Sequence, residues 1–565
     1  MKVFFPFHRY FIVFSTLFLL FSHHITAQTP IPKHEVRAVW LTTIGGLDWP
    51  HTYAQTESSA LRQKRELCDI LDKLKAANVN TVLLQTRIRG TVIYPSLYEP
   101  WDGCLSGVPG RSPGYDALAF AIDECHKRGM EIHAWVVTMP VGKWTKSGCQ
   151  HLRKRYPKML RMIGEDGYMN PECDETAVYL GKICREIAEN YDVDGIHLDY
   201  IRYPETWPLK VTRPQGRQFI TSIVRHIHNE VKAAKPWVKM SCSPIGKYNN
   251  LTRYDSYGWN AYNKGCQDAQ GWLRDGLMDE LFPMMYFRGD QFYPFVLDWQ
   301  ENSYGRTIAV GLGIYFLSEK EKNWSADIIK RQMEVVRRQG LGHAYFRSRF
   351  FTDNVKGIYD YAKDMLDNHP ALVPAMTWAS ATPPLPPVTF NVRHGTDSDN
   401  LSWCDATDRS GGPYLLYNVY ASPTWPVDIS DARNLVTTNY RRQEIRIGRK
   451  SSSRPLHYAV TAMDRYGNES EPVCSPAPKN EYIATTIMRN DGRRLRLPER
   501  GNNLDADYLT IESMQGNIIK TLPYRETSAD ISDVPEGVYI LKSLGKKGVT
   551  HRLYHFTIKR KQSRR

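Results

Sequence analysis

Hydrophobic and polar residues follow two alternating patterns over the first two thirds of the chain. Short apolar runs predict buried strands, and the segments between them carry apolar residues three and four positions apart, which predicts amphipathic helices. The predicted strands cover residues 36–43, 79–87, 130–137, 193–199, 238–243, 280–286, 307–313 and 342–346. The predicted helices cover residues 58–77, 115–128, 175–190, 215–234, 266–273, 325–339 and 355–366.

This alternation predicts an α/β fold, a (β/α)8 TIM barrel that spans residues 34–370. A doubly wound open sheet is the competing fold, and it usually has a glycine-rich phosphate turn after its first strand. Residues 42–49 read Thr-Thr-Ile-Gly-Gly-Leu-Asp-Trp, which does not form that turn. The barrel is therefore the expected architecture.

The pattern changes after residue 370. Residues 371–384 are rich in proline and predict a stiff linker. Residues 385–478 show strand alternation, and Trp403, the strand around Tyr417 and the polar turn at 464–470 resemble a fibronectin type III module. Residues 481–565 predict a second small all-β sandwich, which resembles the C-terminal sorting domain of proteins exported by the type IX route; a plain accessory β-sandwich with a basic tail is the alternative. That resemblance implies the secretion machinery as a partner.

The N-terminus predicts export. Lys2 and Arg9 precede a mostly apolar stretch at 10–21, and the segment 25–27 ends in the small residue Ala27. Residues 1–27 therefore resemble a signal peptide. A short membrane anchor is the alternative. With a mean hydropathy of −0.48 and no other long apolar run, the mature chain is expected to have no stable membrane span and to be secreted or periplasmic, with the cell surface as a further possibility.

Charge and cysteine content narrow the function further. The net charge of +14 permits an acidic polymer as ligand, but part of the excess lies in the basic tail, and no nucleic-acid partner is expected. The chain has no P-loop, dinucleotide fingerprint or GxSxG motif, and no cofactor is expected. The ten cysteines contain no CxxC pair; their even number permits disulfides in an exported protein, and a bridge between Cys149 and Cys173 is conceivable.

The strongest catalytic candidate lies at the end of the predicted strand 193–199. Strand alternation directs Ile196 and Leu198 towards the helices, and it directs His197 and Asp199 towards the barrel axis. Asp199 then stands at the barrel mouth, where active sites of this fold lie. It is a candidate nucleophile or stabiliser of an oxocarbenium ion, and the alternative is a structural Asp that caps the following loop.

Other strand ends supply polar and aromatic residues expected to bind substrate. These predicted substrate-binding residues are Arg87, Arg89, His133, Trp135, His197, Tyr200, Arg202 and Tyr286. Arginines beside Asp199 are expected to hold it ionised. Taken singly, Arg87 also fits a buried ion pair and His133 a core histidine.

A glycosidase usually needs a second carboxylate. The first choice for the catalytic acid/base is Asp290, after the strand 280–286, followed by Glu205, Asp48 and Asp268. A Gly-Asp turn such as Gly289–Asp290 is also a common loop element without chemistry.

The segments 35–41, 91–96, 133–135, 169–171 and 194–204 together resemble the glycosyl-hydrolase-like 10 family over residues 34–370. The resemblance implies a secreted or periplasmic glycosidase of bacterial polysaccharide, with peptidoglycan glycan strands among the proposed substrates. It places the catalytic strand-end Asp at Asp199. Many relatives have a second acidic residue next to it, whereas this chain has Tyr200, so the role of that carboxylate is absent or moved.

Two other functions compete with the glycoside hydrolase. One is a metal-dependent carbohydrate deacetylase that uses His133, His197 and Asp199 as ligands. The other is a non-catalytic glycan-binding protein whose barrel has lost its acid.

Overall fold

The computed structural model describes residues 31–448, 456–476, 493–497, 506–513, 517–524, 527–545 and 550–558. The chain divides into two compact units, residues 1–475 and 476–565. The predicted signal peptide lies outside the described residues. Within the described residues, no helix is both long and apolar enough to cross a membrane.

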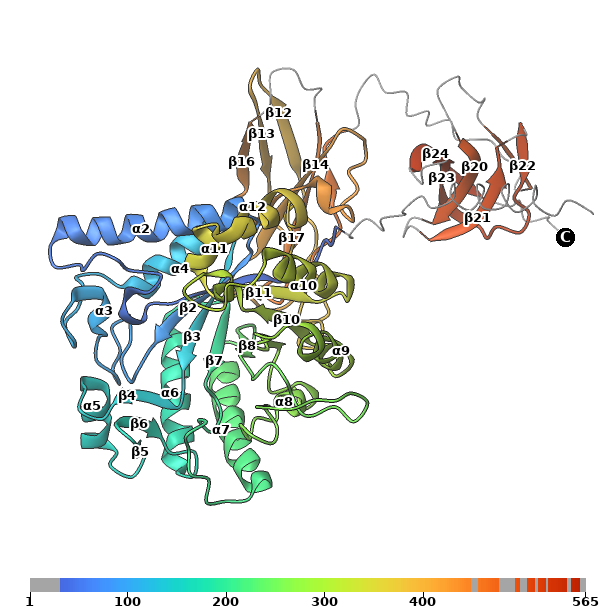
Figure 1. Cartoon of the computed structure of the whole chain (residues 1–565). Coiled ribbons are helices and arrows are strands. Elements are labelled where there is room, and N and C mark those ends of the chain that lie inside the picture. The colour runs from blue at the N-terminus through green and yellow to red at the C-terminus, as the bar shows by residue number, and fades with distance from the viewer. Residues whose placement is uncertain are drawn as a thin grey trace, which may run out of the picture. The chain divides into compact units, whose positions relative to one another are not determined.

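The first unit contains a closed barrel of parallel strands, which confirms the predicted (β/α)8 fold (Figure 1). The strands follow the order β1-β11-β10-β9-β8-β7-β3-β2 around the barrel. Their bounds are β1 (Arg37–Leu41), β2 (Thr81–Arg87), β3 (Glu131–Val137), β7 (Gly195–Asp199), β8 (Lys239–Cys242), β9 (Glu280–Leu281), β10 (Thr307–Leu312) and β11 (Gly342–Tyr345). Each overlaps one of the strands expected from the sequence.

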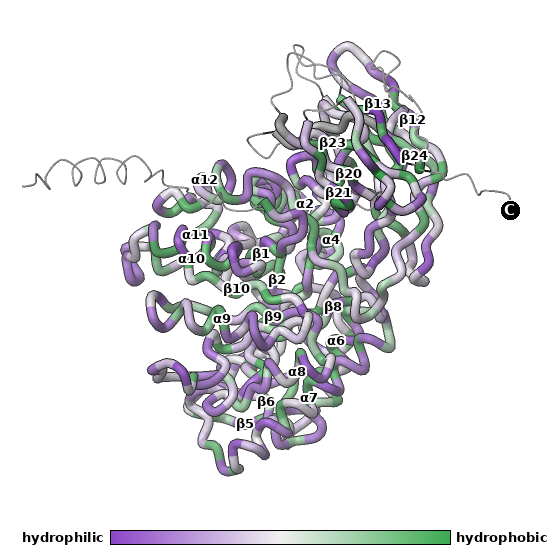
Figure 2. The backbone as a smooth tube through the Cα atoms, turned by 90° about the vertical axis from the view of Figure 1, so that its right-hand side faces the viewer, coloured by the Kyte–Doolittle hydropathy of each residue, from purple (hydrophilic) through white to green (hydrophobic). Residues whose placement is uncertain are grey.

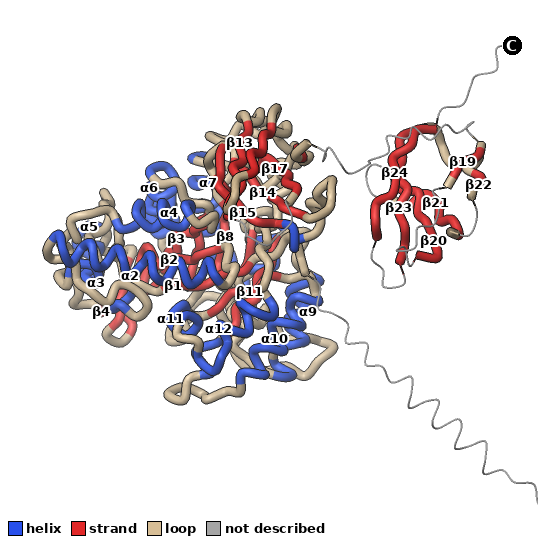
Figure 3. The backbone as a smooth tube through the Cα atoms, turned by 90° about the horizontal axis from the view of Figure 1, so that it is seen from above, coloured by secondary structure: helices blue, strands red, loops and turns tan. Residues whose placement is uncertain are grey.

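Helices lie outside these strands, as the view from above shows (Figure 3). The main helices are α2 (Glu57–Ala76), α4 (Ala117–Lys127), α6 (Asp174–Asn190), α7 (Arg213–Ala234), α8 (Ala269–Arg274), α9 (Tyr293–Glu301) and α10 (Ala326–Arg338). Hydrophobic and hydrophilic residues alternate along them (Figure 2). Capping boxes at Thr56 and Thr212 begin α2 and α7 by accepting backbone N–H groups that the first helical turn leaves free.

The predicted helix at 355–366 is instead three short turns. These are η4 (Val355–Gly357), α12 (Ile358–Tyr361) and η5 (Ala362–Leu366). Lys356 and Gly357 have φ angles of 52° and 75°, in the left-handed region, and a continuous right-handed helix cannot include them.

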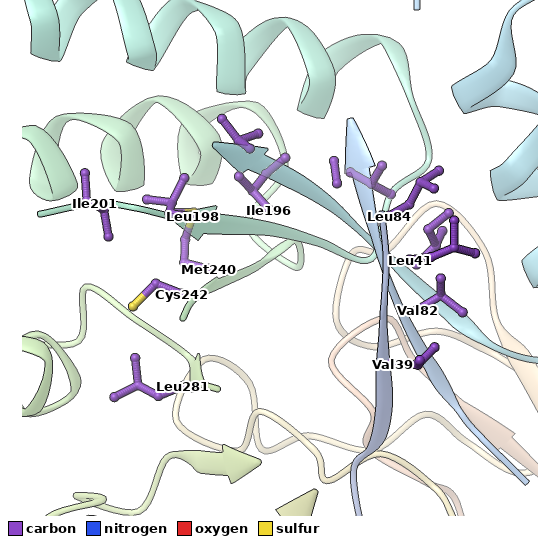
Figure 4. Packing of buried hydrophobic residues seen from close by; sticks show 14 of the residues in the cluster. Val39, Leu41, Val82, Leu84, Ile196, Leu198, Ile201, Met240, Cys242 and Leu281 are labelled. Atoms are coloured by element: carbon purple, nitrogen blue, oxygen red, sulfur yellow. The ribbon is translucent and has the colours of Figure 1, made fainter. Parts of the chain in front are cut away.

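Strand alternation builds two apolar layers. Ile196 and Leu198 pack with helix residues in the layer between barrel and helices, where Met240 and Leu281 also lie (Figure 4). The barrel interior is filled by a second cluster that includes Trp40, Leu83, Trp135 and Phe282. The inward and outward faces predicted for the strand 193–199 are therefore those of the structure.

A small antiparallel sheet follows β3 and was not predicted. It has the order β4-β6-β5, with β4 (Pro140–Lys143), β5 (Leu160–Ile163) and β6 (Asp166–Met169), and α5 (Ser147–Arg155) lies between β4 and β5 in the chain. Because its strands have only four residues each, they are too short for a periodic pattern to reveal.

Two antiparallel sheets complete the first unit as a small all-β domain. One has the order β12-β13-β16 and the other β15-β14-β17-β18. Their strands are β12 (Phe390–His394), β13 (Ser398–Trp403), β14 (Leu416–Ser422), β15 (Leu435–Tyr440), β16 (Glu444–Gly448), β17 (His457–Met463) and β18 (Val473–Cys474). Their core includes Trp403, Tyr417 and Tyr458, so the early-strand tryptophan is buried as the pattern indicates.

This β domain packs directly on the amino-terminal end of the barrel. The buried Arg465 donates to Asp194, which precedes β7, at 2.9 Å. The proline-rich segment also lies against the barrel, because Trp378 donates to Asp279 at 2.8 Å and its ring stacks on Arg306. The segment expected as a linker is thus part of the packed structure.

The second unit is a further small all-β domain. Its described strands form a sheet of order β21-β20-β23-β24 and a pair β19-β22. The bounds are β19 (Arg494–Arg496), β20 (Ala506–Ser513), β21 (Ile518–Pro523), β22 (Ser528–Asp530), β23 (Gly537–Gly545) and β24 (Thr550–Ile558). It has its own apolar core, which includes Leu509, Leu541 and Phe556.

Candidate active site

A cavity of about 810 Å³ opens at the carboxyl-terminal end of the barrel strands. Its walls come from the segments that follow β1, β2, β7, β9, β10 and β11 and from the small sheet β4-β6-β5. This is the end of the fold at which barrel enzymes bind substrate. Ligand cavities commonly measure about 300 to 1,000 Å³, so a segment of an oligosaccharide fits.

Asp199 lines this cavity at the end of β7, with 7% of its surface exposed. Its Oδ1 accepts hydrogen bonds from the Ser243 hydroxyl at 2.7 Å and from the backbone N–H of Tyr200 at 2.8 Å. Its Oδ2 accepts from Trp135 Nε1 at 3.1 Å. Thr138 donates to the Asp199 carbonyl from both its N–H and its hydroxyl. The carboxyl group therefore has a fixed orientation.

The pKa of Asp199 is raised above its ordinary value. Burial is the largest cause, and the opposing effects of Ser243, Tyr200 N–H, Arg202 and Trp135 offset it only in part. Arg202 acts to lower this pKa, as the sequence predicts of a nearby arginine, but burial outweighs its effect. A raised pKa makes a carboxyl group better suited to donate a proton, so the environment favours a general acid over a nucleophile.

The turn after β7 brings a second carboxylate to the same cavity. Tyr200 has a φ of 53°, and this left-handed residue reverses the chain so that Arg202 lies over the Tyr200 ring at 4.5 Å. Arg202 Nη2 contacts Glu205 Oε1 at 2.9 Å. Tyr200 and Glu205 both line the cavity.

The pKa of Glu205 is lowered. Its burial acts to raise the pKa, but the charge and hydrogen bond of Arg202 outweigh that effect. Asp199 and Glu205 thus sit on one cavity with pKa values shifted in opposite directions. A pair of this kind can divide the roles of acid and ionised partner between two carboxyl groups.

Aromatic residues form one wall of the cavity. The ring of Tyr286 lies 5.7 Å from that of Tyr315 and 5.5 Å from that of Phe346, centroid to centroid. The buried Tyr286 hydroxyl has no hydrogen-bond partner among the residues that the structure describes, and burial raises the pKa of Tyr286 well above its ordinary value, so it is a neutral donor. Flat rings and a free hydroxyl suit the apolar face and hydroxyls of a sugar.

Four of the predicted substrate-binding residues line the cavity. These are Arg89, Trp135, Tyr200 and Tyr286. Arg202 lies behind them and acts through Glu205 and Tyr200.

Arg87 does not reach the cavity. It is fully buried, and its guanidinium group binds Glu99 at 2.7 Å and the backbone carbonyls of Val137 and Thr138. The register of β2 shifts between Gln85 and Arg87, which ends the alternation assumed from the sequence. The ion-pair alternative for Arg87 is the one that the structure shows.

His133 and His197 lie inside the barrel and are fully buried. Ser241 Oγ bridges their Nδ1 atoms, at 3.3 Å from His133 and 3.0 Å from His197. The second ring nitrogen of His197 accepts from Trp40 Nε1 at 3.2 Å. Both histidines are therefore core polar groups beside the interior aromatic cluster, and neither lines the cavity.

The other candidate carboxylates are placed elsewhere. Asp290 is exposed in η2 (Gly289–Gln291) and does not line the cavity, so the structure does not support its assignment as acid/base. Asp48 binds Thr42 and Arg347, and Asp268 caps α8. Glu205, a lower choice from the sequence, is the one that shares the cavity with Asp199.

The arrangement of the metal-dependent alternative is not present. Ser241 and Trp40 occupy both nitrogens of His197, and no group of three or more His, Cys, Asp or Glu in the described ranges is placed to hold a metal ion. Cys149 and Cys173 are free thiols, and Cys149 contacts the carbonyls of Val141 and Gly142.

Comparisons with known proteins give matches to glycosyl hydrolases. The family model "Glycosyl hydrolase-like 10" matches residues 35–210 and 211–315. The chain is 28% identical over 482 residues to glycosyl hydrolase YngK of Bacillus subtilis (strain 168), which covers 77% of this chain and 92% of the relative. It is 27% identical over 357 residues to glycosyl hydrolase DigH of Escherichia coli (strain K12), covering 55% of this chain and 81% of the relative. These matches support a glycoside hydrolase-type function.

Among solved structures, the α-L-fucosidase isoenzyme 2 from Paenibacillus thiaminolyticus aligns at a TM-score of 0.40 and 13% identity. The alignment covers 58% of this chain and 49% of that chain.

Proposed function

We propose that this chain is a glycoside hydrolase of the glycosyl-hydrolase-like 10 family that cleaves O-glycosidic bonds of a complex polysaccharide. The observation that carries the proposal is the Asp199 carboxyl, which lines the cavity, is fixed by Ser243 and Trp135, and has a raised pKa. In this role Asp199 protonates the glycosidic oxygen as its bond to the anomeric carbon breaks.

Glu205 supplies the second carboxylate in this mechanism. Arg202 holds it ionised, so it can take a proton from an attacking water molecule or attack the anomeric carbon itself. In either case one water is added across the bond. If Glu205 is the base, it takes the proton of the water and passes it to solvent, from which Asp199 is protonated again; if Glu205 is the nucleophile, the water that releases the covalent intermediate returns its proton to Asp199. The anomeric configuration of the first product, followed by proton NMR, distinguishes the base from the nucleophile.

The substrate and location are also part of the proposal. We take peptidoglycan glycan strands as the first polysaccharide to test, with other bacterial and plant polysaccharides beside them. The predicted signal peptide supports action outside the cytoplasm. The two antiparallel sheets over residues 390–474 support a fibronectin type III-like spacer, and the second unit is the part proposed to contact a secretion machinery.

The test is product analysis with matched variants. Four proteins are incubated with purified glycan strands and a panel of polysaccharides: the wild type, Asp199→Asn, Glu205→Gln and the exposed control Asp290→Asn. The masses of the products are measured by mass spectrometry. We expect products that gain one water with the wild type and the control, and a loss of these products with the first two variants.

Other outcomes contradict the proposal in different ways. Products that lose only acetyl groups indicate a deacetylase. Binding by both the wild type and Asp199→Asn without turnover of any polysaccharide indicates a glycan-binding protein.

A further inference from the structure

Arg89 is a cation without a partner on the wall of the cavity. Its guanidinium group has no hydrogen bond or ion pair to any of the residues that the structure describes, and the residue is exposed. The two other cations of the lining are paired, since Lys143 contacts Glu165 and Asp166 and Arg347 contacts Asp48. Arg89 is thus the cation of this lining that is left for a ligand.

The stem of Arg89 is held in place by close packing. A Cβ atom on Gly142 would lie 2.8 Å from Arg89 Cδ, and Gly142 has a φ of 83°, so only glycine suits this position. A Cβ on Gly148 would lie 2.0 Å from the Arg89 carbonyl oxygen. A Cβ on Gly90 would lie 2.7 Å from Val141 Cγ1. Glycines on three sides therefore let β4 and α5 close around this segment.

This packing matters because a flexible arginine loses conformational freedom when it binds. Here the aliphatic stem packs on Gly142, the backbone packs on Gly148, and Arg89 lines the cavity. A pre-organised guanidinium binds a carboxylate through two parallel hydrogen bonds with less entropic cost than a mobile side chain.

The cavity carries an unpaired anion on another side. Glu321 lines it, is exposed and has no ion pair among the described residues. Glu321 follows β10 in the chain, whereas Arg89 follows β2, and β1 and β11 separate these two strands in the barrel. A ligand with a negative group is attracted to the Arg89 side and repelled from the Glu321 side, which gives it one orientation.

We propose that Arg89 binds a carboxylate carried by the sugar chain, so that the substrate class is an acidic glycan. The inference rests on the proposed function, because it assigns a ligand to the same cavity. Arg89 binds the acidic group of the glycan, and Asp199 protonates the glycosidic oxygen. A neutral glycan of the same linkage leaves the guanidinium group with water alone and is bound more weakly.

The test measures binding, so that it does not depend on turnover. The Asp199→Asn protein is titrated by calorimetry with oligogalacturonate and with peptide-free peptidoglycan glycan strands, each paired with the same glycan after reduction of its carboxyls to alcohols. We expect at least one carboxylated probe to bind about tenfold or more tightly than its reduced partner. Arg89→Gln in the same background removes that difference, and Arg89→Lys retains part of it.

Arg111→Gln is the matched control for the change in net charge. Arg111 is exposed and lies outside the cavity lining, so the preference for the carboxylated probe is expected to persist in this variant. The proposal is overturned if neither carboxylated probe is preferred, or if Arg89→Gln keeps the preference.

The two proposals fail in distinguishable ways. An Arg89-dependent preference in a protein that hydrolyses none of the glycans overturns the hydrolase and leaves the acidic ligand. Hydrolysis of a neutral glycan, with no effect of Arg89→Gln on binding, supports the hydrolase and overturns the acidic ligand.

Discussion

The two ends of the barrel bury acidic residues in opposite environments. At the amino-terminal end, Asp367 lies between Arg37, Arg337 and His343, and Arg37 also binds Glu35 at 2.7 Å. At the carboxyl-terminal end, Asp199 receives hydrogen bonds from a hydroxyl, an indole and a backbone N–H. Both carboxyl groups are buried, but only Asp367 has direct ion pairs.

The difference in partners reverses the direction of the pKa shift. Burial acts to raise both pKa values, yet Arg37, His343 and Arg337 outweigh it at Asp367, whose pKa is lowered. Neutral donors do not outweigh it at Asp199, whose pKa is raised. An ion-paired carboxylate stabilises the fold, whereas a carboxyl group with neutral donors can hold a proton for chemistry.

The largest expected effect is on turnover in Asp199→Asn. Loss of the proton donor is expected to lower kcat by about 10² to 10⁴-fold. The melting temperature is expected to stay equal or to rise, because a raised pKa means that the folded state disfavours the ionised carboxylate that Asn removes. Steady-state kinetics and calorimetric melting measure the two quantities. If kcat and the melting temperature both fall, Asp199 stabilises the fold as Asp367 does, and it is not assigned as the proton donor.

The matching change at the other end is Asp367→Asn. It removes one of the two carboxylates, Asp367 and Glu35, that Arg37 and Arg337 share in a buried site, and we expect the free energy of unfolding to fall by about 3 to 5 kcal/mol. The kcat of the folded protein is expected to change little. Urea denaturation at neutral pH gives the first quantity, and kinetics under folding conditions give the second.

The pH dependence of stability sharpens this second result. Because the folded pKa of Asp367 is lowered, its contribution is fully present above the unfolded pKa of about 3.9 and is lost as pH falls towards the folded value. Asp367→Asn is therefore expected to lose less stability than the wild type over that acidic interval. An unchanged acid dependence contradicts the ion-pair assignment.

The third prediction concerns Arg202, which lowers the pKa of both cavity carboxyl groups. Arg202→Gln removes this influence, so both pKa values rise. The acidic limb of the kcat/KM profile reports ionisation of Glu205, and the basic limb reports loss of the Asp199 proton, so both limbs are expected to move to higher pH. Profiles of the wild type and Arg111→Gln are the references, and a shift of one limb alone removes the unshifted carboxyl from the mechanism.

The barrel and the inward face of β7 could be predicted from the sequence because periodicity alone fixes them. Ile196 and Leu198 face the helices, and His197 and Asp199 face the interior. Where a side chain of a loop ends up depends on tertiary packing instead. Asp290 therefore lies outside the cavity, and Glu205 lies inside it.

Two further features have no periodic signal in the sequence. The register shift after Gln85 changes which residue of β2 reaches the cavity. The pKa of Asp199 is raised by burial, which the hydrogen bonds from Ser243 and Trp135 offset only in part, and the extent of that burial cannot be read from the local sequence.

The smallest expected effect comes from removing the second unit. A chain that ends at Ser475 keeps the barrel, the β domain and the contact of Arg465 with Asp194. Because the second unit has its own core, we expect its removal to change the melting temperature of the first unit by no more than a few degrees. The kcat on a soluble oligosaccharide is expected to change by less than about twofold.

A chain that ends at residue 370 is the contrasting control. It removes Arg465 and Trp378, and so leaves Asp194 and Asp279 without these partners at the amino-terminal end of the barrel. We expect it to melt at a markedly lower temperature than the chain that ends at Ser475, because buried carboxylates lose partners that hold them ionised. Equal melting of the two truncated chains contradicts the view that the β domain completes this end of the barrel.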